Sequence, residues 1–169
     1  LSIGVTTKWD GAPAVICGID AADGKLFVGT NAAFANDPKI CKTPKDIQEF
    51  YGASALAQKL LASLEYLPSS VKSGILQGYL MFTNDKKTER IDGKSFTTFR
   101  PNTITYAADP TSPLGKEIDQ AKIGIVFHTK YTGTSMSDLT ASFNVGASDF
   151  TTGGNVWAEK AEFKDISGV

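Results

Sequence analysis

Apolar and polar positions alternate in short blocks at the start of the chain, a pattern typical of strands joined by tight turns. Residues 2–8 alternate weakly and are rich in β-branched side chains, and apolar runs follow at residues 13–20 and 25–30. Between these runs, Asp23 and Gly24 supply the positive φ that a tight hairpin needs. We therefore expect three strands, of which the last two form a hairpin.

A helical pattern follows in residues 44–66. Thr43, Pro44 and Asp46 provide an N-cap hydroxyl, a proline in the first turn and an acid three residues after the cap. Apolar residues then recur at near-helical spacing, and Gly52 interrupts them. The pattern predicts either one helix or two helices joined at this glycine.

The rest of the chain reads mainly as strands. The apolar segments at residues 74–83 and 122–131 predict buried strands, and the charged segment between them, residues 84–94, predicts an exposed loop. Weaker patterns predict one short helix at residues 112–120 and three short strands at residues 96–100, 103–107 and 155–163. Together these elements predict an α+β fold built on antiparallel sheet, with residues 1–169 as a single domain.

Composition narrows the function classes. The net charge of −1 gives no sequence-wide attraction to nucleic acid or to an acidic membrane, although it leaves a local basic groove open. No apolar run approaches the roughly 20 residues that cross a bilayer, so we expect a cytoplasmic protein without a membrane partner. Cys17 and Cys41 match no metal-binding spacing and are expected to be reduced, buried thiols. Because the chain begins with Leu1 rather than Met, we expect a fragment.

One short motif carries candidate chemistry. In Lys8-Trp9-Asp10-Gly11 a lysine stands at the predicted end of a strand, and the glycine would let backbone amides approach a phosphate closely. The lysine amine can attack phosphorus only when it is uncharged, which requires its pKa to fall from about 10.4 to about 7 to 8. The alternative interpretation of Lys8 is an exposed charge at a strand end.

The segment TTKWDGA resembles the adenylated-lysine motif of the covalent nucleotidyltransferases, which include ATP-dependent DNA ligases, RNA ligases and mRNA capping enzymes. Together with VGTNAAF, FRPNTITY and VFHTKYTG, the segment KWDGAPA is similar to an uncharacterised group of ligase-like proteins from tailed bacteriophages. The resemblance implies a ligase adenylation domain, ATP-grasp-like and incomplete at its C-terminus. It also implies a location in the cytoplasm of an infected host cell.

The resemblance further implies a reaction. Lys8 would attack the α-phosphate of ATP, with Mg²⁺ neutralising the triphosphate, and the resulting lysyl-AMP would pass AMP to the 5′-phosphate of DNA or RNA, as in nucleic-acid repair. Asp10 and Gly11 would orient the lysine and face the ribose. Thr6 falls where relatives carry a purine-reading side chain, and Thr7 lies beside it in the same nucleotide-binding segment.

Matches to the other family motifs are partial. Thr30 matches the hydroxyl of the second motif, but Asn31 stands where a cation is expected. Tyr79 occupies the position of the acid in the third motif. Phe127 would stack on the adenine, and Arg100 is a candidate phosphate contact with an ordinary surface arginine as the alternative. No residue is assigned to a metal.

Other polar residues are expected to be structural. His128, the single histidine, is interpreted as a hydrogen-bonded core residue and not as a catalyst. Lys86, Lys87 and Arg90 alternate with acids, which favours a solvated loop over a phosphate-binding track.

Two alternatives to the ligase hypothesis remain. Asn31 and Tyr79 favour a catalytically degenerate ligase-fold phage protein that binds a nucleotide or another protein. No Glu-Gly pair of the kind found in a later family motif occurs in the sequence, so either the chain is truncated before that motif or the enzyme is degenerate. In the second alternative the chain is an unrelated small β-rich binding module, in which the lysine motif is a coincidence.

Overall fold

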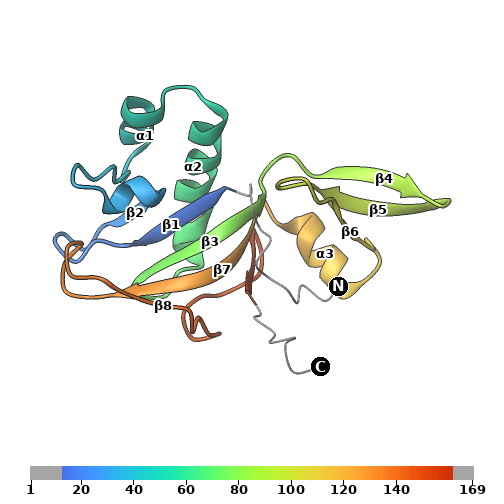
Figure 1. Ribbon diagram of the computed structural model, residues 1–169. Coiled ribbons are helices and arrows are strands. Elements are labelled where there is room, and N and C mark those ends of the chain that lie inside the picture. The colour runs from blue at the N-terminus through green and yellow to red at the C-terminus, as the bar shows by residue number, and fades with distance from the viewer. Residues whose placement is uncertain (1–12, 162–169) are drawn as a thin grey trace.

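The computed structural model of the chain describes residues 13–161. Within this range the fold is α+β, with two sheets and three α-helices (Figure 1). The main sheet has the order β2-β1-β3-β7-β8, and β9 also pairs with β7. Its strands are β1 (Ala14–Ile19), β2 (Leu26–Gly29), β3 (Ile75–Phe82), β7 (Ile123–Thr132), β8 (Thr140–Ser142) and β9 (Val156–Lys160). All pairs in it are antiparallel except β7 with β9.

The first hairpin and the helices form where the sequence predicts them. Gly24 adopts a φ of 70° in the turn between β1 and β2. Thr43 and Asp46 form a reciprocal capping box at the start of a helix that ends at Gly52, where φ is 65°. A second helix then begins, so the alternative with two helices is the one observed. The helices are α1 (Pro44–Tyr51), α2 (Ala55–Tyr66) and α3 (Pro113–Gln120), and short 3-10 turns occur at η1 (Asn31–Phe34) and η2 (Leu67–Ser69).

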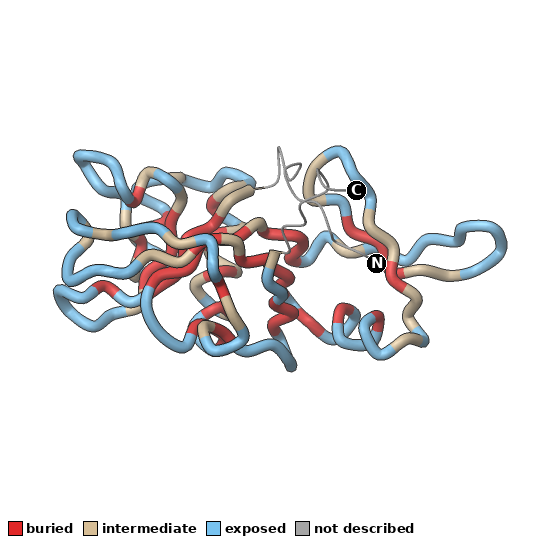
Figure 2. Tube along the Cα trace, turned by 60° about the horizontal axis from the view of Figure 1, so that its bottom comes forward, coloured by how far each residue is buried: buried red, intermediate tan, exposed pale blue. Residues whose placement is uncertain are grey.

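The largest core lies between α2 and one face of the main sheet (Figures 1 and 2). Side chains alternate along each strand, so Val15 and Cys17 of β1 face the helices while Ile16 faces the other side. On that other side Ile16 packs with Phe27 and Ile75 in a smaller cluster. Each central strand thus has apolar contacts on both faces, as its continuous hydrophobic sequence predicts.

A register shift separates the two halves of the β3–β7 pair. Gln77 lies opposite Thr129, whereas the next residue, Gly78, lies opposite Phe127. His128 is therefore the extra residue of a β-bulge on β7. The bulge changes the direction in which the side chains of β7 project next to β3.

The second sheet contains β4 (Lys87–Ile91), β5 (Lys94–Phe99) and β6 (Tyr106–Ala108), in that order. The prediction of a loop over residues 84–94 is therefore wrong, because β4 pairs with β5 across a turn at Asp92-Gly93. All five residues of β4 are exposed, so this strand lacks the apolar alternation that predicts a strand from sequence.

Lys86, just before β4, also differs from its sequence interpretation. Its Nζ donates to the carbonyl oxygens of Ile118, Asp119 and Ala121, at 2.7, 3.1 and 2.7 Å. Lysine side chains favour the C-terminal ends of helices because unpaired carbonyls there carry partial negative charge. Lys86 is thus bound to the end of α3 and is not part of a solvated loop.

Candidate functional site

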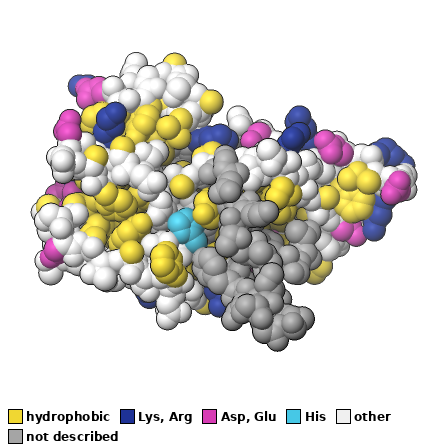
Figure 3. All heavy atoms as spheres, in the orientation of Figure 1, with side chains coloured by type: hydrophobic (Ala, Val, Ile, Leu, Met, Phe, Trp, Pro, Cys, Tyr) yellow, Lys and Arg dark blue, Asp and Glu magenta, His cyan; other side chains and the backbone are white. Residues whose placement is uncertain are grey.

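Polar and aromatic side chains gather on the face of the main sheet opposite α1 and α2. Along β3, Leu76 and Leu80 pack in the core beneath α2, so Gln77 and Tyr79 project to the other side. We call this surface the polar face and define it by Asn31, Gln77, Tyr79, His128 and Tyr131. The histidine is visible on this side of the molecule in the space-filling view (Figure 3).

A chain of two hydrogen bonds crosses the polar face. The Tyr131 hydroxyl donates to Gln77 Oε1 at 2.6 Å, and Gln77 Nε2 donates to Asn31 Oδ1 at 2.9 Å. The Phe34 ring packs on Tyr131, with 4.7 Å between the ring centroids. Burial raises the pKa of Tyr131, so its hydroxyl remains protonated at neutral pH. The chain joins η1, β3 and β7.

A pair of rings lies next to this chain. The centroids of Tyr79 and His128 are 4.5 Å apart and their planes are tilted by 38°. His128 Nδ1 lies 2.6 Å from the Thr129 hydroxyl, whereas Nε2 is buried and has no hydrogen-bond partner within residues 13–161. Burial lowers the pKa of His128, which favours the neutral ring at pH 7. The sequence interpretation of a hydrogen-bonded histidine therefore holds for one ring nitrogen, and the other is buried without a partner among the described residues.

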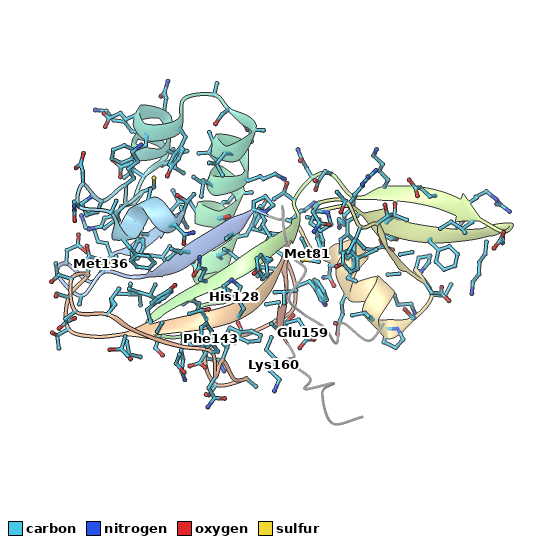
Figure 4. The ribbon with its side chains drawn as sticks, viewed as in Figure 1. Met81, His128, Met136, Phe143, Glu159 and Lys160 are labelled. Atoms are coloured by element: carbon cyan, nitrogen blue, oxygen red, sulfur yellow. The ribbon has the colours of Figure 1, made fainter. Side chains whose placement is uncertain are left out.

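A cavity of about 280 Å³ continues the polar face past Tyr131. Ile75, Tyr131, Met136 and Leu139 contribute to its lining. Figure 4 shows His128 near the middle of the sheet and Met136 in the β7–β8 loop. Another cavity, of about 440 Å³, lies beside α2 and the end of α3, and none of the residues that define the polar face lines it.

The described chain begins at the edge of the polar face. The Pro13 carbonyl accepts a hydrogen bond from Leu80 N at 2.9 Å, and Ala14 is the register partner of Tyr79. Strand β1 therefore starts directly beside Tyr79. The catalytic candidate Lys8 and the nucleotide-binding candidates Thr6, Thr7, Asp10 and Gly11 precede this point in sequence, and they lie outside the described residues together with the strand predicted at residues 2–8.

Four predicted site residues lie within the described part of the chain, and the structure does not bring them together. Asn31 reaches the polar face through its bond with Gln77. The Thr30 hydroxyl instead accepts from Ala32 N and bonds with Tyr51 of α1, so it caps η1 on the helix side.

Phe127 and Arg100 also lie away from the polar face. Phe127 is fully buried in the core beneath α2, with its centroid 5.2 Å from that of Phe150. Arg100 is exposed just after β5, and its Nε donates to the Asn102 carbonyl. The aromatic surface on the polar face comes from Tyr79 and His128 instead.

Sequence reasoning missed the roles of Gln77 and Tyr131. A single polar residue inside the apolar segment Ile75–Phe82 was the available signal, because a glutamine on a buried strand needs hydrogen-bond partners. Those partners are 46 and 54 residues away in sequence, so no local pattern identifies them.

The described residues offer neither a cluster of metal ligands nor a membrane-spanning helix. No group of three or more His, Cys, Asp or Glu residues in the described range could hold a metal ion. Among the helices of that same range, none has the length and apolar character needed to cross a lipid bilayer.

Comparison with known proteins gives a family. A search of the curated proteins and a search of the solved structures found no match. The family model described as "Family of unknown function (DUF6267)" matches residues 1–169, the whole chain. The chain therefore belongs to the DUF6267 family.

Proposed function

We propose that this chain is an ATP-dependent nucleotidyltransferase of the polynucleotide-ligase type, with Lys8 as its nucleophile and a ligase-type adenylation fold. The uncharged Lys8 amine attacks the α-phosphorus of ATP and a phosphorus–nitrogen bond forms. The bond to the β-phosphate breaks, pyrophosphate leaves and the amine loses a proton. AMP then passes from the lysine to the 5′-phosphate of a nucleic acid.

The observation that carries the proposal is that two motif positions, Asn31 and Tyr79, lie on one face of the sheet, beside the start of β1. Asn31 stands at the second motif of the covalent nucleotidyltransferases and Tyr79 at the third. Gln77, which bonds Asn31, lies two residues from Tyr79 on the same face of β3. Strand β1, which directly follows the lysine motif in sequence, begins beside Tyr79. Lys8 precedes Pro13 by five residues, a length that spans at most about 18 Å. A lysine on such a tether can reach the polar face.

The residues of the polar face suit the uncharged parts of a nucleotide. In the proposal Tyr79 and His128 offer ring surface to a purine, and the exposed Asn31 amide offers hydrogen bonds. Phe127 is excluded from this role by its complete burial. In the proposal Mg²⁺ would accompany ATP and neutralise part of the charge of its phosphates.

The polar face supplies no cation to activate Lys8. None of its five defining residues carries a positive charge, and the position where the family has a lysine or arginine is Asn31. In the proposal the pKa of Lys8 would be lowered by the positive charge of the Mg²⁺ that accompanies ATP and by the exclusion of water from the amine.

The same observation favours a second candidate function, in which the chain binds a nucleotide or a protein partner without transferring AMP. The cation and the acid of the covalent nucleotidyltransferase motifs are replaced here by Asn31 and Tyr79. Asn31 is bonded to Gln77, and the Tyr79 ring packs on His128. These contacts would preserve a binding surface after the loss of catalysis.

Labelling with ATP distinguishes the two candidates. The full chain is incubated with Mg²⁺ and ATP labelled at the α-phosphate, and covalent label is measured after denaturing electrophoresis. We expect label on the wild type and on Lys45→Ala, a control at an exposed lysine of α1, and none on Lys8→Ala. ATP binding by calorimetry without label would support the second candidate. Absence of both binding and label would contradict the nucleotidyltransferase and the nucleotide-binding form of the second candidate, and would leave only its protein-binding form.

A further inference from the structure

The hydrogen-bond chain across the polar face has a defined direction. The Tyr131 hydroxyl donates to Gln77 Oε1, so the amide nitrogen of Gln77 faces the other way and donates to Asn31. Gln77 is only 6% exposed and lies between β1 and β7, where Ile16 and Thr129 are its register partners. Its amide is therefore held in one orientation by both its bonds and its surroundings.

This direction decides what Asn31 presents to a ligand. Its Oδ1 is already occupied by Gln77, so the amide group Nδ2, with two hydrogens, is the part that remains. The residue is exposed, and no residue in the range 13–161 accepts a hydrogen bond from Nδ2. A donor that is oriented before a ligand arrives loses little conformational freedom on binding.

We propose that Tyr131 and Gln77 are positioning residues that fix Asn31 as a neutral N–H donor to an oxygen of the bound nucleotide. This inference rests on the proposed function, since it names the role of one position in that site. The oxygen belongs either to a phosphate or to the ribose, because an amide donates to both. Asn31, at the position where the ligase-type resemblance implies a cation, would thus act as a neutral donor. Tyr131, 54 positions away from Gln77 in sequence, would hold it in place through Gln77.

A double-mutant cycle on nucleotide affinity tests the positioning role. Asn31→Ala and Tyr131→Phe are each expected to weaken ATP binding roughly three- to tenfold, the effect of one neutral hydrogen bond. If Tyr131 acts through Asn31, the double variant binds no more weakly than Asn31→Ala alone. A merely structural role of Tyr131 would instead give additive losses.

Controls separate this inference from the proposed function. Tyr66→Phe removes a phenol hydroxyl from α2, on the other side of the sheet, and should leave ATP affinity unchanged. Circular dichroism checks that each variant is folded. Titration with adenosine identifies the oxygen: a loss seen with ATP alone indicates a phosphate, and a loss with both ligands indicates the ribose.

Three results would overturn the inference. An Asn31→Ala variant that binds ATP as tightly as the wild type would contradict the donor role. Additive losses of affinity in the cycle would contradict the positioning role. In both cases the wild type itself would still bind ATP. Failure of the wild type to bind ATP would overturn the proposed function as well.

Discussion

Gly78 is the residue on which the geometry of the polar face depends most directly. It lies between Gln77 and Tyr79 and opposite the bulge that sets the direction of His128. A Cβ atom at this position would lie 2.6 Å from the Val126 carbonyl oxygen and 3.0 Å from the Phe127 Cα. Both are backbone atoms of the neighbouring strand, so they cannot rotate away as a side chain could. Only glycine allows β3 and β7 to approach so closely.

We predict that Gly78→Ala lowers the free energy of unfolding by about 1–3 kcal/mol, the usual cost of overpacking an interior. Gly146→Ala is the matched control, since its added methyl group would meet only the Asp149 carboxylate, at 4.0 Å. Urea denaturation of both variants measures the difference. A loss at Gly78 no larger than that at Gly146 would mean that the strands separate without cost.

Single residues differ in how far the sequence predicts them. Cys17 and Cys41 are free and buried, as composition and spacing indicate, and burial raises their pKa to about 12 and about 11. The bond between Tyr131 and Gln77 depends instead on the order of the strands and on the bulge, and no local sequence pattern predicts either of them. The burial of the cysteines was therefore predictable, whereas the side of the sheet that a strand residue occupies was not, as Phe127 illustrates.

Elements with strong local signals were predicted well. The capping box at Thr43, the glycine at position 52 and the hairpin turn at Gly24 each act within a few residues, so their effect is visible in the sequence. Strand β4 was missed because pairing with β5, and not burial, holds it in place. Exposed charges are common on such edge strands, where they discourage pairing with other chains.

Lys86 links two elements that are far apart in sequence. Its three bonds join the segment after β3 to the C-terminal end of α3, and its ammonium lies 4.9 Å from the centroid of the Phe82 ring. Burial removes part of the water around the ammonium and thereby lowers the pKa of Lys86. The carbonyl oxygens of α3 replace that water.

We predict that Lys86→Met lowers the free energy of unfolding by about 2 kcal/mol, because three carbonyl groups lose a charged donor. Methionine keeps most of the apolar stem, so the loss is specific to the ammonium group. Lys87→Met, on the exposed strand β4, should change stability by less than about 0.5 kcal/mol. Urea denaturation gives the totals, and faster hydrogen exchange confined to α3 would locate the effect. Equal losses in the two variants would count against the interpretation.

At the scale of the whole molecule, an aromatic cluster joins the second sheet to the main sheet. The ring centroids of Phe82 in β3 and Phe99 in β5 are 5.1 Å apart, and Trp157 of β9 lies 6.2 Å from Phe82 and 6.4 Å from Phe99. Beyond this cluster the β4–β5 hairpin extends away from the rest of the fold (Figure 1). The attachment of the second sheet to the main sheet therefore depends on a few large side chains. Phe99 is the main side chain that the second sheet contributes to this contact.

This arrangement predicts that Phe99→Ala releases the second sheet before the main sheet unfolds. The side chain is 5% exposed, so its removal should cost about 3–5 kcal/mol, whereas Phe143→Ala, at a side chain 72% exposed, should cost less than about 0.5 kcal/mol. Hydrogen exchange resolved by residue is the decisive measurement. Amides of β4, β5 and β6 should lose protection in Phe99→Ala while those of β1, β3 and β7 keep most of theirs, since the core beneath α2 does not include Phe99. An equal loss of protection in both sheets would mean that they unfold as one unit, and that the cluster stabilises the fold as a whole instead of attaching one part to another.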